Sequence, residues 1–233
     1  MDILISGAGV AGLPVAYWLR QFGFHPTVVE RAGSLVTGGY KIDVRGSALD
    51  VLRRMGAHDA VVEASTRMRG ALLVDREGTV IDELSGDQFG HRVGGDLEIV
   101  RGDLCQILMD RASGVEVIFD DVIESIAETP GRAEVTFRRG GPRAFDLVVG
   151  ADGLHSNVRP LAFRGELGFL RDLGMYLCVY TVPNELGLDR MEVQYSEVGR
   201  VAALWATRAD AGAKACFGFA AARPRVELRR RRQ

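Results

Sequence analysis

Several features that would point to particular classes of protein are scarce or absent in this chain of 233 residues. Its three cysteines, Cys105, Cys178 and Cys216, lie far apart, with neither the pattern of a disulfide framework nor the spacing of a metal site. No apolar run approaches the roughly 20 residues of a membrane span. Met1 is not followed by the basic segment that opens a secretory signal. We therefore expect a cytoplasmic protein without a bound metal or a membrane span.

Lysine is also nearly absent, and the basic residues are distributed unevenly. Lys41 and Lys214 are the only lysines, the formal net charge is −2, and six arginines fall within residues 223–233. The rest of the chain is therefore more acidic than its total suggests and gives no sign of nucleic-acid binding. The apolar fraction of 47% and the charged fraction of 26% are ordinary for a globular protein. The length allows one large domain or two interleaved smaller ones.

The first thirty residues have the pattern of a β-α-β unit. Residues 2–6 predict a short apolar strand, residues 13–22 have the apolar spacing of a helix packed on one face, and residues 27–30 predict a second strand. Pro14 falls in the first turn of that helix, where its missing N–H costs little. A glycine-rich loop joins the first strand to the helix.

That loop reads Gly7-x-Gly9-x-x-Gly12, and each glycine has a physical reason. Gly7 permits a tight turn, Gly9 lets the backbone approach a pyrophosphate, and Gly12 lets helix and strand pack closely. Glu30 ends the second strand, where its carboxylate would accept both hydroxyls of an adenosine ribose and would repel the phosphorylated ribose of NADP. The combination predicts dinucleotide binding, but it does not separate FAD from NAD.

In the remainder of the chain the predicted secondary structure changes near residue 160. Before that point the pattern predicts helices over 46–56 and 103–112, a β-hairpin over 71–83, and strands over 97–100, 115–119, 121–128, 133–138 and 144–149. Afterwards short strands separated by turns predict an antiparallel sheet, at Met175–Val182, Met191–Ser196, Val201–Thr207 and Ala213–Ala220. We expect the hairpin to join this late sheet, so that one domain interrupts the other.

Two further features suggest a ligand. In residues 146–159 an apolar strand stops at a small polar turn, Asp152-Gly153, and the stretch ends at Arg159. Such turns, at the ends of buried strands, are where α/β folds place ligand-binding groups. Arg101 stands at the start of a predicted helix, where the helix dipole disfavours a cation unless the cation faces an anion.

Together these motifs resemble the single-component FAD-dependent aromatic hydroxylases, or monooxygenases, and most of all their tetracycline- and polyketide-hydroxylase branch. The resemblance covers residues 1–160. The motifs that carry it are Gly7-Ala-Gly-Val-Ala-Gly12, Glu30-Arg31, Gly38-Gly-Tyr-Lys-Ile-Asp43-Val-Arg45-Gly, Arg101-x-Asp-Leu104, and Asp146-Leu-Val-Val-Gly-Ala-Asp152-Gly153-x-x-Ser156-x-x-Arg159.

The resemblance implies an α/β fold in which a Rossmann-like FAD-binding domain, built on a parallel sheet, is interleaved with an antiparallel β-sheet substrate domain. The expected bounds are 1–70 and 97–165 for the FAD-binding domain, 71–96 and 166–221 for an incomplete substrate domain, and 222–233 for a disordered basic tail.

The resemblance also implies a set of cofactor contacts. The glycine loop and its helix would hold the FAD pyrophosphate, Glu30 the adenosine ribose, and Arg101 the phosphate or ribityl region, with Arg31 near the adenine. The segment around Asp43 would lie beside the flavin, and flavin and reduced nicotinamide would both approach Asp152-Gly153. The complete set is Gly7, Gly9, Ala11, Gly12, Glu30, Arg31, Asp43, Arg101, Leu104, Asp152 and Gly153.

The implied activity is hydroxylation of an aromatic or polyketide-like small molecule, with NAD(P)H and O2 as co-substrates and a flavin C4a-hydroperoxide as the oxidant. Because the cofactor performs this chemistry, no catalytic side chain is expected. The late sheet would bind the substrate. Five aromatic residues there are either walls of the substrate site or, as we favour, core residues: Tyr176, Tyr180, Tyr195, Trp205 and Phe217.

The chain departs from the family in one respect. A third FAD motif, Gly-Asp-Ala-Ala, normally follows the substrate sheet and is missing here, so we expect a C-terminally truncated member with weak FAD retention and largely uncoupled NADH oxidation. Arg229–Arg232 would contact an anionic surface, form a disordered tail, or result from translation past a frameshift. A degenerate flavin-binding remnant stays open as an alternative. A halogenase and a dehydrogenase are disfavoured, since Trp-x-Trp and Tyr-x-x-x-Lys are absent.

Overall fold

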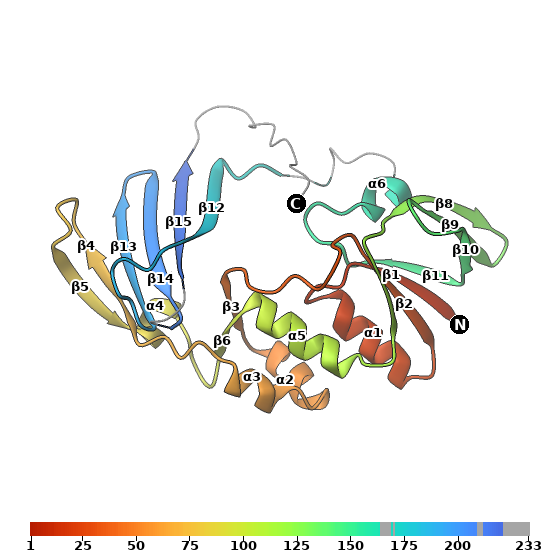
Figure 1. Cartoon of the computed structure of the whole chain (residues 1–233), viewed down its shortest axis with the longest axis horizontal. Helices are drawn as coiled ribbons and strands as arrows, with labels where there is room; N and C mark the ends of the chain where they lie inside the picture. The colour runs from red at the N-terminus through yellow and green to blue at the C-terminus, as the bar shows by residue number, and fades with distance from the viewer. Residues whose placement is uncertain (164–168, 170, 209–211, 221–233) are drawn as a thin grey trace. The chain divides into compact units, whose positions relative to one another are not determined.

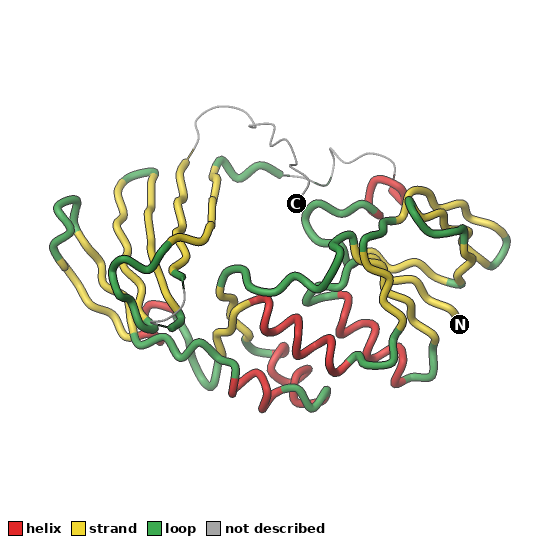
Figure 2. Tube along the Cα trace, in the orientation of Figure 1, coloured by secondary structure: helices red, strands yellow, loops and turns green. Residues whose placement is uncertain are grey.

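The computed structural model divides the chain into two compact units, each formed by two separate segments (Figures 1 and 2). Unit 1 consists of Met1–Ser65 and Leu97–Phe169, and unit 2 of Thr66–Asp96 and Leu170–Gln233. The residues that the structure describes are 1–163, 169, 171–208 and 212–220. The expected basic tail, with Arg229–Arg232, lies outside them.

Unit 1 is built on a four-stranded sheet with the order β11-β1-β2-β7. Every neighbouring pair in it is parallel, which confirms the parallel sheet expected from the sequence. Parallel neighbours require a crossover, and a helix, α1, supplies it between the first two strands. The elements are β1 (Asp2–Ser6), α1 (Gly12–Gln21), β2 (His25–Glu30), β7 (Glu116–Phe119) and β11 (Leu147–Gly150).

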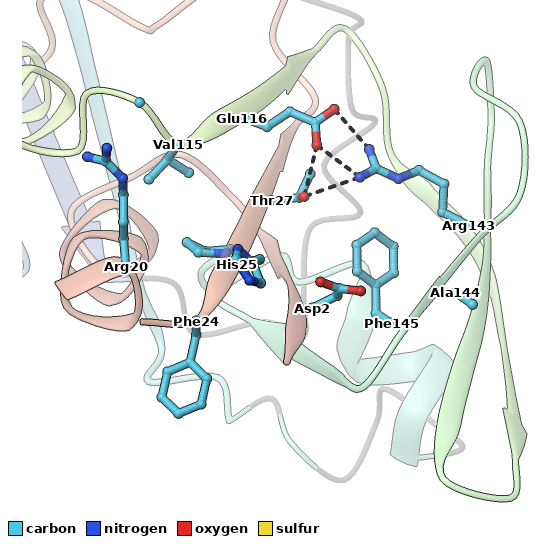
Figure 3. A pocket seen from close by; sticks show the side chains of 12 residues that line it. Asp2, Arg20, Phe24, His25, Thr27, Val115, Glu116, Arg143, Ala144 and Phe145 are labelled. Carbon is cyan, nitrogen blue, oxygen red and sulfur yellow. Dashed lines mark hydrogen bonds and ion pairs between the residues drawn. The ribbon is translucent and has the colours of Figure 1, made fainter. Parts of the chain in front are cut away.

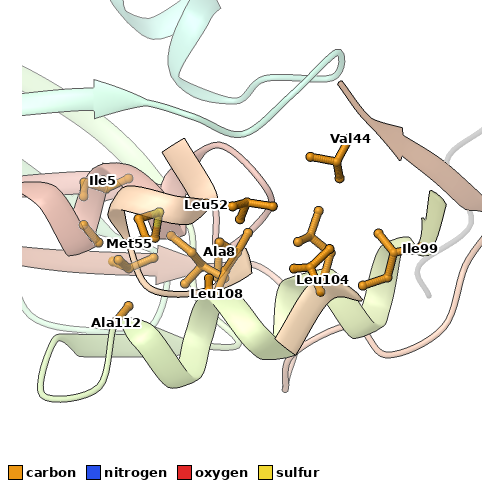
Figure 4. Packing of buried hydrophobic residues seen from close by; sticks show 14 of the residues in the cluster. Ile5, Ala8, Val44, Leu52, Met55, Ile99, Leu104, Leu108 and Ala112 are labelled. Atoms are coloured by element: carbon orange, nitrogen blue, oxygen red, sulfur yellow. The ribbon is translucent and has the colours of Figure 1, made fainter. Parts of the chain in front are cut away.

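Three helices and a two-stranded antiparallel ribbon complete the main core of unit 1. They are β3 (Lys41–Val44), α2 (Ser47–Arg54), α3 (His58–Glu63), β6 (Leu97–Val100) and α5 (Arg101–Arg111). Their apolar side chains pack against those of the first strand and of the glycine loop (Figure 4). The sequence pattern predicted α2 and α5 within two residues but missed β3 and α3, which are too short to show a clear period.

A second, smaller sheet in unit 1 is antiparallel, with the order β10-β9-β8. Its strands are β8 (Ile123–Thr129), β9 (Arg132–Phe137) and β10 (Arg143–Phe145). A short helix, α6 (Val158–Phe163), packs near β8. The aromatic rings of Phe137 and Phe145 meet edge to face in the core of this sheet.

The prediction of one strand over 144–149 is wrong, because the chain changes sheets at Asp146. Residues before it belong to β10 in the antiparallel sheet, and residues after it belong to β11 in the parallel sheet. Asp146 is fixed to the start of β1 by two hydrogen bonds: its N–H donates to the Asp2 carbonyl at 2.8 Å, and its carboxylate accepts from the Asp2 N–H at 2.7 Å. An uninterrupted β pattern in the sequence does not reveal such a change of partner.

Unit 2 is a six-stranded sheet with the order β12-β15-β14-β13-β4-β5, and the early hairpin joins the late strands as expected. The expectation of a purely antiparallel sheet is wrong at one pair, because β13 and β4 are parallel. A long connection joins these two strands, so neither direction is imposed by a hairpin. The strands are β4 (Gly70–Val74), β5 (Val80–Ser85), β12 (Met175–Val182), β13 (Met191–Glu197), β14 (Arg200–Ala206) and β15 (Ala213–Ala220).

The segment that follows β5 contains a one-turn helix, α4 (Gly86–Gly90). Its capping box is complete: the Gln88 N–H donates to the Ser85 hydroxyl, and the Gln88 side chain accepts from the Ser85 N–H. Across the part of the chain that the structure describes, no helix is long and apolar enough to cross a membrane.

Candidate dinucleotide-binding site

The glycine loop is packed too closely to admit side chains at its first and last glycines. A Cβ on Gly12 would lie 1.9 Å from the carbonyl oxygen of Gly7, so α1 begins directly against the end of β1. Gly7 has a φ of +106°, and a Cβ there would lie 2.7 Å from the carbonyl oxygen of Ala151. The Asp152-Gly153 turn, which follows β11 and is called the second turn below, therefore packs its backbone against the glycine loop. The structure brings together the two motifs that lie furthest apart in the sequence.

The amino end of α1 is open to an anion. Ala11 precedes the helix, and no side chain in the described part of the chain caps it. Val10 and Ala11 are exposed. N–H groups at a helix start that lack intrahelical partners, together with the positive end of the helix dipole, form a binding site for phosphate groups.

Arg101 projects toward the same loop from the start of α5. One of its terminal guanidinium nitrogens lies 3.5 Å from the position that a Cβ would take on Gly9. The Arg101 N–H donates to the carbonyl of Tyr40 at 3.0 Å, and a Cβ on Gly102 would lie 2.0 Å from the backbone nitrogen of Gly38. The segment before β3 is thus packed against the first turn of α5, which positions the guanidinium beside the glycine loop.

Glu30 is oriented by two backbone donors that sequence reasoning did not identify. One carboxylate oxygen accepts from the N–H of Ala8 at 2.8 Å, and the other accepts from the N–H of Ala32 at 2.9 Å. The side chain is only partly buried, and each oxygen keeps a further lone pair for a hydroxyl donor. The next residue, Arg31, is exposed. The carboxylate at the end of β2 is therefore held ready beside the loop.

The side chains of Leu104 and Asp43 contact groups other than the glycine loop. Leu104 is 6% exposed and packs in the main apolar core, so its side chain can act on a cofactor only through the position of α5. Asp43 forms an ion pair with Arg45 at 2.7 Å, and the neighbouring Lys41 pairs with Glu98 at 3.3 Å. Lys41, Asp43 and Glu98 therefore share one face of the β3–β6 ribbon, where the Lys41–Glu98 pair is largely buried.

Asp152 directs its carboxylate into the protein. It accepts hydrogen bonds from the hydroxyls of Ser6 and Ser156, at 3.2 and 2.6 Å, and from the N–H groups of Asn157 and Val158, at 2.7 and 3.0 Å. Burial alone would raise the pKa of Asp152, but these donors outweigh it and hold the pKa below its ordinary value. The residue after it, Gly153, has a φ of +77° and is exposed.

A cavity of about 340 Å³ lies elsewhere in unit 1, at the amino ends of the parallel strands (Figure 3). Glu116 and Arg143 form an ion pair at 2.9 Å on its wall, and Thr27 donates to the same carboxylate at 3.0 Å (Figure 3). Ligands of parallel α/β sheets bind at the carboxyl ends of the strands. The glycine loop, Glu30 and Asp152 all lie at that opposite end, which makes it the better candidate site.

The five aromatic residues of unit 2 are divided between the two faces of its sheet. The strand register places Tyr176, Tyr180, Tyr195 and Phe217 on one face and Trp205 on the other. Trp205 is buried, as expected of a core residue. Tyr180 and Phe217 are 53% and 40% exposed, so the favoured interpretation of them as core residues is wrong.

Comparison with known proteins agrees with this geometry. Residues 1–169 match the family model described as "FAD binding domain". The chain belongs to this FAD-binding family. It is 42% identical to an uncharacterized protein of Mycobacterium tuberculosis, over 97% of this chain and 62% of that protein. It is 41% identical to a flavin-dependent monooxygenase of Legionella longbeachae, over 83% of this chain and 50% of that protein.

Two solved structures show the same fold. The crystal structure of the tetracycline destructase Tet(51) matches 98% of this chain and 59% of its own, with a TM-score of 0.87 and 35% identity. CtdE in complex with FAD matches with a TM-score of 0.76 at 17% identity, which shows the fold alone. The chain thus spans between half and two thirds of the length of the proteins that it resembles, and its α/β fold class and family are confirmed.

Proposed function

We propose that this chain forms the FAD-binding part of a flavin-dependent monooxygenase that uses NAD(P)H and O2 to hydroxylate an aromatic or polyketide-like small molecule. The observation that carries the proposal is the convergence of three groups on the glycine loop. These are the guanidinium of Arg101, the open amino end of α1, and the carboxylate of Glu30. Two positive features and one hydroxyl acceptor are what a pyrophosphate next to a ribose requires.

Each group of residues at the site would have a separate role toward FAD. The backbone of Gly7, Gly9, Ala11 and Gly12 would approach the pyrophosphate, and Arg101 would neutralise its charge. Glu30 would accept the ribose hydroxyls, with Arg31 near the adenine. Bound FAD would supply hydride acceptance from a reduced nicotinamide and activation of O2 for transfer of one oxygen atom. Asp152 would act through the turn that it holds together, and the exposed Gly153 would be the part of that turn nearest the cofactor.

One observation favours a second candidate, a flavin-binding protein with little hydroxylase activity. Leu147 on the edge strand β11 is 47% exposed, which leaves apolar surface at the edge of the parallel sheet.

Flavin titration followed by anaerobic mixing with NADH and NADPH distinguishes these functions. We expect the purified chain to quench FAD fluorescence and the bound flavin to bleach with a reduced nicotinamide. Reoxidation with tetracycline present then separates the two candidates: a product heavier by one oxygen atom supports the monooxygenase, whereas hydrogen peroxide alone supports the second candidate. Failure to bind FAD would contradict both.

Replacement of Arg101 by glutamine tests the anion site directly. We expect the Kd for FAD to rise about tenfold, because a charge-assisted contact to a phosphate is lost. The difference between the wild type and Arg101→Gln is expected to shrink as the salt concentration rises. Arg111→Gln, at the exposed far end of the same helix, is the matched control and should leave the Kd within twofold of the wild type. Equal Kd values for Arg101→Gln and the wild type would remove Arg101 from the site.

A further inference from the structure

The second turn is joined to the glycine loop both by backbone and by side chain. The Ala151 N–H donates to the carbonyl of Ser6 at 2.9 Å, where β1 and β11 end side by side. Ser6 is itself buried. At the next residue, Gly7, the carbonyl oxygen of Ala151 lies so close to the backbone that a Cβ would be only 2.7 Å from it. The two turns are therefore in direct contact through their backbones.

The hydrogen bonds to Asp152 are of two kinds. The donors Ser156, Asn157 and Val158 follow within six residues, so their bonds fix the shape of the turn and the start of α6. Ser6 is 146 residues away, at the end of the strand that leads into the glycine loop. Its hydroxyl is the donor that connects the carboxylate to β1.

We infer that Ser6 is a positioning residue of the cofactor site. Its hydroxyl holds the Asp152-Gly153 turn in register with the Gly7–Gly12 loop, so that both surfaces face the same ligand at a fixed separation. Asp152 then contributes by accepting from Ser6 rather than by touching the cofactor with its carboxylate. The role inferred for the ligand-bound state rests on the proposed FAD site, whereas the coupling of the two turns does not.

The test compares Ser6→Ala with a matched control, Thr27→Val. Thr27 is also buried, lies on the neighbouring strand β2, and donates its hydroxyl to the carboxylate of Glu116 at 3.0 Å, but at the opposite end of the sheet. Each variant removes one hydrogen bond from a hydroxyl to a carboxylate, and Thr27→Val also removes the longer bond that the Thr27 hydroxyl accepts from Arg143 at 3.4 Å. We therefore expect decreases of a few degrees in Tm for both variants. Only Ser6→Ala should act on the turns.

Two measurements separate a positioning role from a structural one. In the chain without FAD, amide hydrogen exchange across residues 151–158 should be about fivefold faster in Ser6→Ala and unchanged in Thr27→Val. The Kd for FAD should rise about fivefold to tenfold in Ser6→Ala and stay within twofold in the control.

The outcomes distinguish this inference from the proposed function. If the two variants have the same exchange rates over 151–158 and the same Kd, the positioning role of Ser6 is overturned. If the wild type binds no FAD, the proposed function fails, and the exchange measurement alone decides whether Ser6 couples the turns. Faster exchange in Ser6→Ala with an unchanged Kd would overturn the role in cofactor binding.

Discussion

Replacement of Gly12 by alanine is expected to raise the Kd for FAD by at least about 100-fold. The added Cβ would lie 1.9 Å from the carbonyl oxygen of Gly7 and 3.4 Å from the side chain of Ile5. Because the nearest atom belongs to the backbone, the clash is relieved only if α1 moves away from β1. That movement displaces the open amino end of the helix from the loop that it serves. Fluorescence titration with FAD measures the effect.

Gly33→Ala is the matched control for this experiment. Gly33 lies just beyond β2, has no positive φ, and would place its Cβ at least 4 Å from other heavy atoms. We expect its Kd and its Tm to equal those of the wild type. A Gly12→Ala chain that binds FAD normally would show that α1 does not hold the cofactor, because the close packing at this point could not have survived the change.

Replacement of Asp121 by alanine is expected to lower the free energy of unfolding by about 3 kcal/mol at neutral pH. Asp121 is buried and follows β7. Its carboxylate accepts from the N–H groups of Val122, Arg139 and Gly140 at 2.8, 3.1 and 2.8 Å, and so joins the parallel sheet to the turn before β10. The alanine variant leaves these donors without their acceptor. Urea denaturation followed by circular dichroism measures the loss.

The same carboxylate predicts a pH dependence. Burial would raise the pKa of Asp121, but its backbone donors outweigh burial and lower the pKa below the ordinary value. Its stabilisation is therefore present above the pKa of the unfolded chain, about 3.9, and is lost as the pH falls through the lower folded pKa. The difference in stability between the wild type and Asp121→Ala should thus narrow as the pH falls through that lowered pKa. Asp120→Asn, which loses only a surface ion pair with Arg139, should stay close to the wild type at neutral and at acidic pH.

The sequence pattern was sufficient for features encoded within a few residues. The glycine spacing, Glu30 at the end of a strand and the helix after Gly12 predicted the β-α-β unit, because each depends on local geometry. Arg101 was identified by an unfavourable local position, a cation at a helix start, and the structure places its guanidinium beside Gly9. The predicted roles of these residues toward FAD stay predictions until binding is measured.

Features that depend on distant partners could not be read from the sequence. Ser6 resembles any small residue in a strand, and its acceptor, Asp152, lies 146 residues away. Asp121 resembles a surface aspartate in a turn, because two of its three backbone donors, Arg139 and Gly140, lie about 20 residues away in the turn between β9 and β10. The parallel pairing of β13 with β4 was missed for the same reason, since alternating apolar residues define a strand but not its neighbour or its direction.

The pairing of β13 with β4 also bears on how the protein is made. In unit 2 the partner of Gly70 is Met191, which a ribosome adds about 120 residues later, and in unit 1 the partner of Ile3 is Leu147. At the usual pace of synthesis, about 5–20 residues per second, roughly 5–25 seconds pass before β13 is available to pair with β4 of the hairpin. The sheet of each unit is completed only after a late strand has left the ribosome. The nascent chain is most prone to aggregate before that strand is available, while strand edges are unpaired.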